Sequence, residues 1–437
     1  FDMKINDVVQ LIRGTPGSVV RLQVMPEDKS GRKEYDIVRA RIELKDSEAR
    51  SVILERLPDV TDPEERVETP AEEAKLSKLD VPETELDNDP TPQEATGKVI
   101  KKRVGPDGKL YKIGVIDLPS FYMDMEGRRS GNPNYKSTSR DVRRLLEEFN
   151  ERGVDLVVMD LRLNGGGSLP ESVETTGLFI DHGPVVQVKG PDGRIQPYND
   201  DDRGMVLSCP FVVVINKFSA SASEIFAGAI QDYGRGIIVG DHATHGKGTV
   251  QQLFELGQIL LPIHQPPNYG ALKLTIQQFY RPSGDSTQNR GVLSDVEIPN
   301  ITTHWEVGES DLDYAMKFDR VMPQKHLNYR HATAQVIEEL RQRSQERVEN
   351  SDYFAKIQKK IERYLEQKEK PTVTLNKEKF LAQRKEVNNE KDQEELFEKM
   401  QDDERPVFPS TPYNKELMAI ALDYLELLGQ NHVAVAR

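Results

Sequence analysis

Four short apolar runs set the strongest constraint on how this chain can fold. They lie at 113–116, 154–159, 211–215 and 237–239 and are rich in β-branched residues. Runs of this length and composition are typical of strands inside a sheet that is covered on both faces. Because helical segments separate them, they predict an α/β domain.

Further elements follow from the spacing of apolar residues. A helix is predicted over 138–149, with Thr138 or Ser139 as N-cap and Gly153 as its stop. Its apolar residues recur at i, i+3, i+4 and i+7: Val142, Leu145, Leu146 and Phe149. Alternating Leu272, Leu274 and Ile276 predict a half-exposed strand.

The two ends of the chain differ from this middle part. Residues 5–24 predict a helix, a tight turn and a strand in which Val20, Leu22 and Val24 alternate. Residues 62–92 hold eleven acidic residues and five prolines, and we expect a mobile acidic linker or insertion there. Beyond residue 310, apolar stripes in the stretches at 331–350 and 353–370 predict amphipathic helices.

The bulk composition excludes several classes of function. The net charge of −14 does not suit a nucleic-acid backbone or an anionic membrane. No run approaches the roughly 20 apolar residues that span a bilayer, and no signal peptide is visible at Phe1. Cys209 is the only cysteine, which excludes an internal disulfide and a cysteine-rich metal site. The histidines show no ligand spacing, so we expect no metal.

Two glycine-rich turns each follow an apolar run. Gly165–Gly167 can bring bare amides against a ligand or can form a tight turn before a helix, and both interpretations stay open. The second turn, VGDHATHGKGTVQQ, resembles a phosphate-binding loop only superficially. Five residues separate Gly240 from Gly246, and Gly248 follows Lys247 where a hydroxyl residue is needed. Nucleotide binding is therefore rejected.

Lys247 suggests a different chemistry. A lysine amine is protonated at neutral pH unless burial lowers its pKa, and a neutral amine can activate a serine hydroxyl. The flanking glycines let the side chain turn inward, and Gln251, four residues on, is close enough on a helical turn to hold the amine.

Three serines alternate with alanine in KFSASASEIFAG, residues 217–228. We expect Ser219 to pack and Ser223 to cap the helix that follows. Ser221 lies between them, and the Ala222 amide at the head of the helix can face an oxygen of a carbonyl that Ser221 attacks.

Four segments in order resemble the carboxyl-terminal processing proteases, in their tail-specific branch: DLRLNGGG, FSASASEIFAGAIQDYGR, GKGTVQQ and FYRPSGDSTQNRGV. The likeness extends to INDVVQLIRGTPGSVVRL, which resembles the second half of a PDZ domain. It implies the C-terminal part of a PDZ domain at 1–56, the acidic segment at 57–96, an α/β catalytic domain of the crotonase and caseinolytic-protease type at 97–305, and a helical region at 306–437. The carboxylate-binding loop of the PDZ domain is expected upstream of Phe1.

The resemblance also implies roles for particular residues. Ser221 would be the nucleophile, Lys247 the general base and Gln251 the residue that orients the lysine, while Gly167 and Ala222 would supply the oxyanion-hole amides. It implies no metal and no organic cofactor. The substrates would be proteins with apolar, unstructured C-termini in a Gram-negative periplasm. An adaptor protein and peripheral membrane association stay open as further partners.

Other interpretations compete with this one. His242 or His245, oriented by Asp241, could replace Lys247 in a Ser-His-Asp arrangement, although no G-x-S-x-G elbow surrounds Ser221. The chain departs from the family pattern at DHATH, which is one residue longer than usual and carries His245 in place of an aromatic residue, and at Ser294 in GVLSD. A silent scaffold or peptide-binding protein that keeps the protease fold, and a crotonase-like acyl-transfer enzyme, are the alternative functions.

Overall fold

The computed structural model describes residues 17–24, 33–39, 49–56, 98–101, 111–260, 269–369 and 406–435. The chain divides into two compact units between Asp46 and Ser47. The expected acidic segment at 57–96 and the helix expected near residues 5–12 lie outside the described residues.

The first unit contains an antiparallel hairpin of β1 (Val19–Val24) and β2 (Lys33–Val38). The strand predicted from the alternation of Val20, Leu22 and Val24 is thereby confirmed as β1. Arg21 and Asp36 face each other across the hairpin in an exposed ion pair of 2.6 Å. Exposed pairs of this kind contribute at most about 1 kcal/mol, so the pair adds little to the stability of the hairpin.

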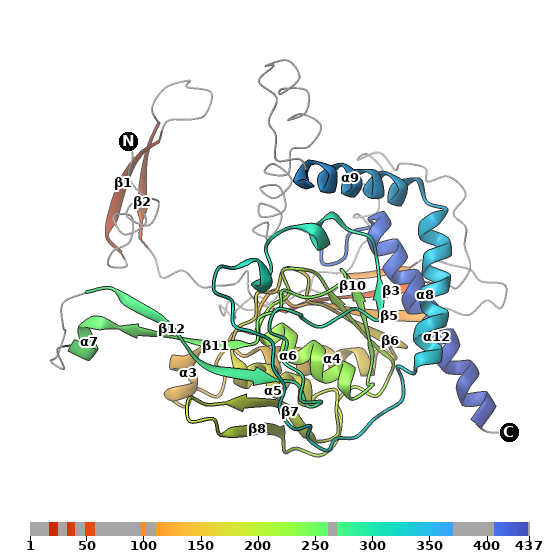
Figure 1. The fold of residues 1–437 in the computed structure, drawn as a ribbon, viewed down its shortest axis with the longest axis horizontal. Helices are drawn as coiled ribbons and strands as arrows, with labels where there is room; N and C mark the ends of the chain where they lie inside the picture. Colours follow the sequence, from red (N-terminus) through yellow and green to blue (C-terminus); the bar gives the residue numbers. More distant parts are fainter. Residues whose placement is uncertain are drawn as a thin grey trace, which may run out of the picture. The chain divides into compact units, whose positions relative to one another are not determined.

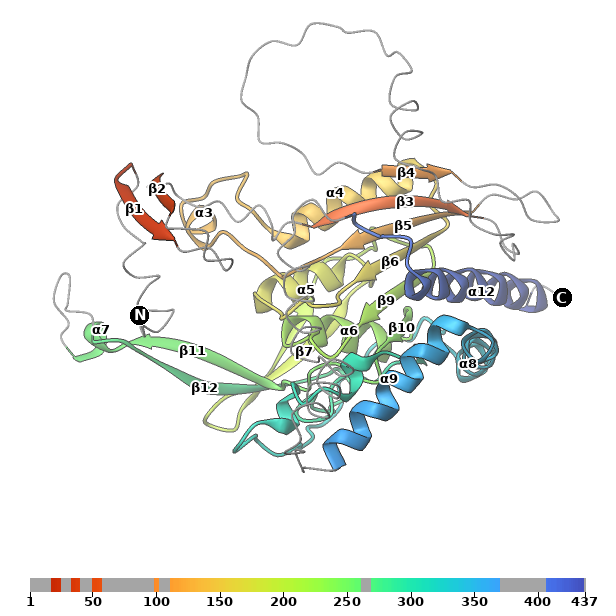
Figure 2. The same cartoon turned by 90° about the horizontal axis from the view of Figure 1, so that it is seen from above.

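The second unit is built on a mostly parallel seven-stranded sheet in the order β13-β10-β9-β6-β5-β3-β4, shown in Figure 1 and, from above, in Figure 2. Its strands are β3 (Arg50–Arg56), β4 (Lys98–Lys101), β5 (Tyr111–Asp117), β6 (Leu156–Asp160), β9 (Phe211–Ile215), β10 (Ile237–Gly240) and β13 (Val296–Glu297). The four apolar runs of the sequence are β5, β6, β9 and β10, and the strands β6, β9 and β10 are buried along their whole length. This confirms the predicted α/β architecture.

The boundary between the units differs from the expected one. Residues 50–56 form β3, which pairs antiparallel with β5 and parallel with β4 in the large sheet. Val52 and Ile53 are buried there, so their apolar surface joins the sheet of the second unit. The division therefore lies near residue 46 and not at residue 56.

Helices cover both faces of this sheet (Figure 2). One face carries α4 (Thr138–Glu151), α5 (Leu169–Gly177) and α6 (Ala222–Asp232), and α3 (Met125–Arg129) precedes them in the chain. The predicted helix over 138–149 is confirmed as α4, although its N-cap is Ser137 and its C-cap Arg152. The other face carries α8 (Ala334–Glu349), α9 (Asp352–Glu369) and α12 (Pro412–Val435), of which α8 and α9 are the two predicted C-terminal helices. Two short 3-10 helices, η2 (Ile301–His304) and η3 (Glu309–Asp311), lie between the sheet and α8 in sequence.

A second sheet has the order β11-β12-β7-β8. Its strands are β7 (Gly183–Lys189), β8 (Ile195–Asp200), β11 (Thr249–Glu255) and β12 (Ala271–Tyr280), and α7 (Leu256–Leu260) follows β11. β12 confirms the strand predicted from Leu272, Leu274 and Ile276. Figures 1 and 2 both show the hairpin of β11 and β12 extending away from the helices, with α7 near its far end.

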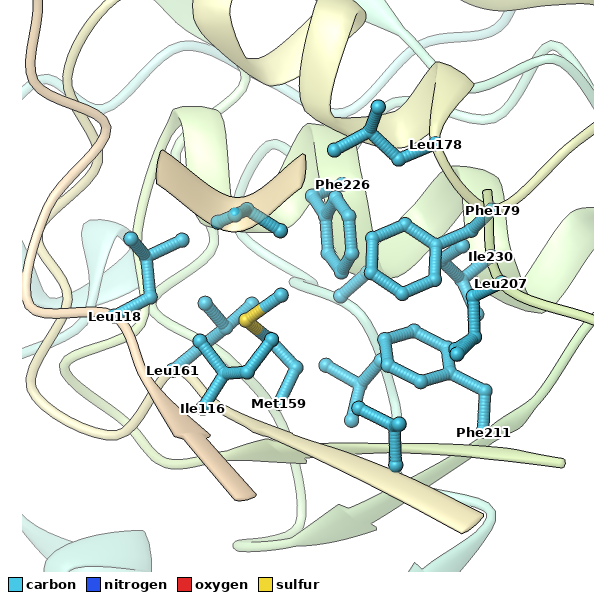
Figure 3. Close-up of a cluster of buried hydrophobic side chains, with 14 of the residues drawn as sticks. Ile116, Leu118, Met159, Leu161, Leu178, Phe179, Leu207, Phe211, Phe226 and Ile230 are labelled. Atoms are coloured by element: carbon cyan, nitrogen blue, oxygen red, sulfur yellow. The ribbon is translucent and has the colours of Figure 1, made fainter. Parts of the chain in front are cut away.

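An aromatic cluster anchors α6 to the large sheet (Figure 3). Phe179 and Phe211 stack with their ring centroids 4.2 Å apart, and Phe226 of α6 meets both rings edge-on at 5.5 and 6.1 Å. All three side chains are fully buried. Such rings contribute apolar burial and a favourable contact geometry, so the start of α6 is held firmly on the sheet.

The C-terminal helices join the core through apolar and charged contacts. Leu417 and Tyr424 of α12 are buried with Leu340 of α8 in the cluster on their side of the sheet. Arg347 of α8 makes a bidentate contact to Glu416 of α12: Nη2 donates to Oε1 at 2.9 Å, and Nε donates to Oε2 at 2.9 Å. None of the described helices is both long and apolar enough to cross a membrane.

Candidate active site

Ser221 occupies a strained position at the head of α6. It is the N-cap of the helix, with φ 55° and ψ −112°, and no cap hydrogen bond to its hydroxyl forms among the described residues. A non-glycine residue in this region costs about 1–3 kcal/mol, a cost that is common at functional sites. The helix had been expected to be capped by Ser223, and this expectation is wrong because the helix begins two residues earlier.

The other two serines make buried hydrogen bonds. Ser219 donates from its hydroxyl to the Leu161 carbonyl at 2.8 Å, and Ser223 donates to the Asn164 carbonyl at 2.9 Å. Both are fully buried, and both bond to the segment that follows β6. The packing role expected of Ser219 is confirmed. The Ser223 hydroxyl instead links α6 to the glycine turn through the Asn164 carbonyl.

The glycine turn after β6 lies directly against Ser221. A Cβ added at Gly166 would come within 2.7 Å of the Ser221 Cβ and 3.0 Å of the Ala222 nitrogen. Gly166 and Gly167 have φ of 103° and 144°, a region that favours glycine. Among the described residues, the amides of Gly167 and Ala222 have no hydrogen-bond acceptor within the protein. Both amides therefore retain a free donor near Ser221.

Asn164 fixes the shape of this turn. Its side chain is fully buried, donates to the Leu118 carbonyl at 2.7 Å and accepts from the Gly166 amide at 2.9 Å. The residue before it, Leu163, has a positive φ of 67°. Sequence reasoning did not single out Asn164, and its place directly before the three glycines was the only signal for it.

Lys247 lies in the turn between β10 and β11. Its Nζ donates to Gln251 Oε1 at 3.2 Å, and its carbonyl accepts from the Thr287 hydroxyl at 2.8 Å. Gln251 is on the strand β11 and not on the predicted helical turn. The register of β11 is irregular between Val250 and Gln251, and an irregularity of this kind re-aims a side chain.

The environment of Lys247 favours its neutral form. Partial burial lowers the pKa of its amine, and the nearby charge of Lys273 lowers it further. Glu309 and Glu224 act in the opposite direction. The net direction is downward, as a general base at neutral pH requires.

Glu224 is a second residue that sequence reasoning missed. Its fully buried carboxylate accepts four hydrogen bonds, and burial nevertheless raises its pKa to about 7. The Oε1 atom takes the Thr244 hydroxyl at 2.6 Å and the Gly246 amide at 2.7 Å, while Oε2 takes the amides of Ser221 at 2.8 Å and Lys247 at 3.0 Å. The spacing Ser-x-x-Glu at the head of a predicted helix was the available signal.

The histidines of the alternative arrangement point elsewhere. His242 Nδ1 lies 3.0 Å from Glu297 Oε2, and His245 Nδ1 lies 4.0 Å from Glu309 Oε2. Asp241 accepts instead from the Thr302 hydroxyl at 2.6 Å and the Lys217 amide at 3.0 Å. Within the described part of the chain, no hydrogen bond joins either histidine to Asp241 or Ser221, and no group of three or more His, Cys, Asp or Glu residues is placed to hold a metal ion.

Comparisons with known proteins show the family of the chain. Residues 112–298 match the model of peptidase family S41, and residues 302–426 match that of the C-terminal domain of tail specific protease. The tail-specific protease of Haemophilus influenzae is 33% identical over 318 residues, which cover 73% of this chain and 36% of that protein. The carboxyl-terminal-processing protease of Picosynechococcus is 31% identical over 210 residues, covering 48% of this chain and 45% of that protein.

Among solved structures, the chain is similar to the photosystem II D1 C-terminal processing protease, with 21% identity and a TM-score of 0.39, over 68% of this chain and 59% of that one. The chain spans less than half the length of the Haemophilus and Picosynechococcus proteases. With both family models matched in order along one chain, the protein belongs to peptidase family S41 and carries the C-terminal domain found in tail-specific proteases.

Proposed function

We propose that this chain is a serine endopeptidase in which Ser221 attacks a peptide carbonyl and Lys247 is the general base. The observation that carries the proposal is the pair of hydrogen bonds to Glu224 Oε2, at 2.8 Å from the Ser221 amide and 3.0 Å from the Lys247 amide. Because both nitrogens bond to one oxygen, they are at most about 6 Å apart. A lysine this close, with a lowered pKa, can reach the serine hydroxyl.

The proposed reaction proceeds through an acyl-enzyme. The neutral Lys247 amine takes the hydroxyl proton as Ser221 Oγ bonds to the carbonyl carbon, and the resulting oxyanion accepts from the Gly167 and Ala222 amides. The Lys247 ammonium then protonates the leaving amine as the peptide bond breaks. A water molecule, deprotonated by the same amine, hydrolyses the ester. Gln251 keeps the lysine directed to the serine through its 3.2 Å hydrogen bond.

The wider setting of the enzyme is also proposed. Residues of the first unit would be the C-terminal part of a PDZ domain, and the β1–β2 hairpin is compatible with it. Substrates would be proteins recognised through apolar, unstructured C-termini, and the working compartment would be the periplasm. The crotonase-type relation of the catalytic domain, its limits at 97–305, an adaptor protein and peripheral membrane association remain predictions.

The test is cleavage of an unstructured polypeptide that ends in Ala-Ala, followed by mass spectrometry. We expect cleavage by the wild-type chain and none by Ser221→Ala or Lys247→Ala at matched thermal stability. His242→Gln is the control, since that side chain is exposed and paired with Glu297. Intact polypeptide with the wild-type chain at every pH would instead support the scaffold interpretation.

A second substrate separates chemistry from recognition. A p-nitrophenyl ester of a short peptide acylates an activated serine without needing a recognition domain, and a burst of nitrophenol reports the acyl-enzyme. The expected adduct lies on Ser221, and Ser221→Ala abolishes the burst. An adduct on another residue, or a burst that survives Ser221→Ala, would remove the assignment of the nucleophile.

A further inference from the structure

The segment from Glu309 to Met316 is fastened at both ends to the turn that carries Lys247. At its start, the Glu309 amide donates to the His245 carbonyl at 3.0 Å. At its end, the Met316 carbonyl accepts from Asn289 Nδ2 at 2.8 Å, and the Asn289 amide donates to the Gly246 carbonyl at 2.7 Å. The position of the segment is therefore set by the residues directly before Lys247.

Gln288 adds a third attachment on the other side of Lys247. Its Oε1 accepts from the Gly248 amide at 2.9 Å, and its Nε2 donates to Glu309 Oε1 at 3.0 Å. Gln288 is fully buried, so this bridge is shielded from water. The start of the segment is thus tied to His245 on one side of the proposed general base and, through Gln288, to Gly248 on the other.

Between these attachments the segment presents apolar side chains to solvent. The side chain of Leu312 is 56% exposed, and Tyr314 is fully exposed at 101%. A large apolar group normally packs against other groups, and the described part of the chain offers the Tyr314 ring no such contact. Both residues are therefore exposed on the segment that is tied to the turn of Lys247.

The backbone makes Tyr314 an unusual choice at its position. The Ala315 amide donates to the Leu312 carbonyl at 3.3 Å, which closes a four-residue turn with Tyr314 as its third residue. Its φ is 62°, and turns with a positive φ at this position usually carry glycine or asparagine there. A bulky ring is strained in this conformation, so a smaller residue would serve the turn itself better.

Carboxylates flank Leu312, and basic groups lie only at the ends of the segment, where Lys217 Nζ approaches Gly308 and Lys317 follows Met316. Residues 309–316 contain Glu309, Asp311 and Asp313 and no lysine or arginine. Asp311 and Asp313 are exposed on either side of Leu312. An occupant that places a cation next to an apolar side chain would match both the charge and the apolar surface.

We propose that Leu312 and Tyr314 bind an apolar side chain of the polypeptide substrate, and that Asp311 and Asp313 favour a lysine or arginine beside it. The proposal rests on the proposed function, because the substrate reaches this surface when its scissile bond lies between Ser221 and Lys247. This preference concerns residues near the cleavage site and is separate from recognition of the substrate's C-terminus. The segment is hydrogen-bonded to the turn of Lys247, where the substrate is proposed to react. This favours the substrate, and not a second copy of the chain, as the molecule that binds here.

The experiment uses one unstructured polypeptide with a mapped cleavage site. A Phe-Arg pair is moved one position at a time through the residues on either side of that site, with Ser-Gln as the reference pair. For the wild-type chain we expect KM to fall by about tenfold at one register, with kcat nearly unchanged. Tyr314→Asn, which suits the backbone conformation, should lose this gain while thermal stability stays the same.

Conservative and matched variants sharpen the result. Tyr314→Phe should keep the full gain, and Asp313→Asn should lose only the part that depends on arginine. Ile195→Ala is the control, because Ile195 is also exposed, at 41%, on β8 at the opposite edge of the sheet from β11. The proposal is overturned if Tyr314→Asn keeps the wild-type preference, if the wild-type chain shows no preferred register, or if the variant changes the oligomeric state.

A binding measurement distinguishes this proposal from the proposed function. In the Ser221→Ala chain, fluorescence anisotropy of the labelled Phe-Arg and Ser-Gln polypeptides gives their Kd values without turnover. Adding Tyr314→Asn should remove the difference between them. A cleavage assay that fails while this difference persists would reject the catalytic mechanism and leave the binding surface intact. Equal Kd values would reject the binding surface.

Discussion

Replacing Glu224 by glutamine separates the charge of this buried carboxylate from its hydrogen bonds. The new NH₂ group should take the Oε1 side, where the Thr244 hydroxyl can accept, because the Oε2 side faces the amides of Ser221 and Lys247. Two buried donors then lose their acceptor: the Gly246 amide and the proton of the Thr244 hydroxyl, whose oxygen already accepts from the Val292 amide. Each buried donor left unpaired costs about 1–3 kcal/mol of the free energy of unfolding.

The pH dependence of stability gives the sharper test of Glu224→Gln. Burial raises the pKa of Glu224 to about 7, so the folded chain holds this proton more tightly than the unfolded chain, in which the carboxyl titrates at its ordinary pKa of 4.5. The contribution of Glu224 to the free energy of unfolding should therefore fall as pH rises between these two values and should stay level above pH 7. The fall is at most about 3 kcal/mol.

Urea unfolding at pH 5, 6, 7 and 8 measures this difference. The gap in stability between Glu224→Gln and the wild-type chain should change by up to about 3 kcal/mol across the range, in favour of the variant at the higher pH. Parallel curves for the two proteins would refute the assignment of a destabilised buried carboxylate to Glu224.

Activity provides the second measurement on this variant. The charge of Glu224 raises the pKa of Lys247, so Glu224→Gln should move the rise of kcat/KM to lower pH. Glu224→Ala removes both acceptor oxygens, and with them all four hydrogen bonds, so it should lower activity at every pH. Equal kcat/KM values for the two variants at every pH would contradict the bridging role.

Three further predictions concern the surroundings of the site. Lys273→Ala should shift the pH profile of kcat/KM to higher pH, since the charge of Lys273 lowers the pKa of Lys247, and Lys273→Arg should not. Gly166→Ala should reduce kcat by about a hundredfold by displacing Ser221, whereas Gly165→Ala, whose Cβ meets nothing within 4 Å, should be tolerated in the same assay. Phe226→Ala should cost about 3–5 kcal/mol in urea unfolding, against under about 0.5 kcal/mol for the exposed Met322→Ala.

The large sheet could be predicted because its strands are buried on both faces. Such strands read as continuous apolar runs, and β6, β9 and β10 each do so. The helix α4 was equally clear, since only one of its faces is buried. By contrast, β3 is joined to the sheet through β5, a pairing between residues about 60 positions apart, and a local pattern does not encode such a distant partner.

The candidate site could be predicted only in part from the sequence. The identity of Ser221 and Lys247 as candidates came from their flanking residues and from resemblance. The sequence did not predict that Gln251 lies on a strand. The irregular register at Val250 and Gln251 arises from pairing with β12, which a local pattern does not show. The role of Glu224 needs the turn at 244–247 to fold back over α6, a contact that no spacing along the chain reveals.

Glu224 and Lys247 also determine each other's protonation. A charged Glu224 raises the pKa of Lys247. Once one of the two groups has taken up a proton on acidification, the other binds its proton less readily. Burial and Lys273 lower the pKa of Lys247 in the direction of Glu224, whose pKa is about 7. Protonation of Glu224 removes the charge that raises the pKa of Lys247, so it favours the neutral lysine. The carboxylate that accepts from the serine and lysine amides would therefore also widen the pH range of the proposed mechanism, in which the neutral lysine is the base.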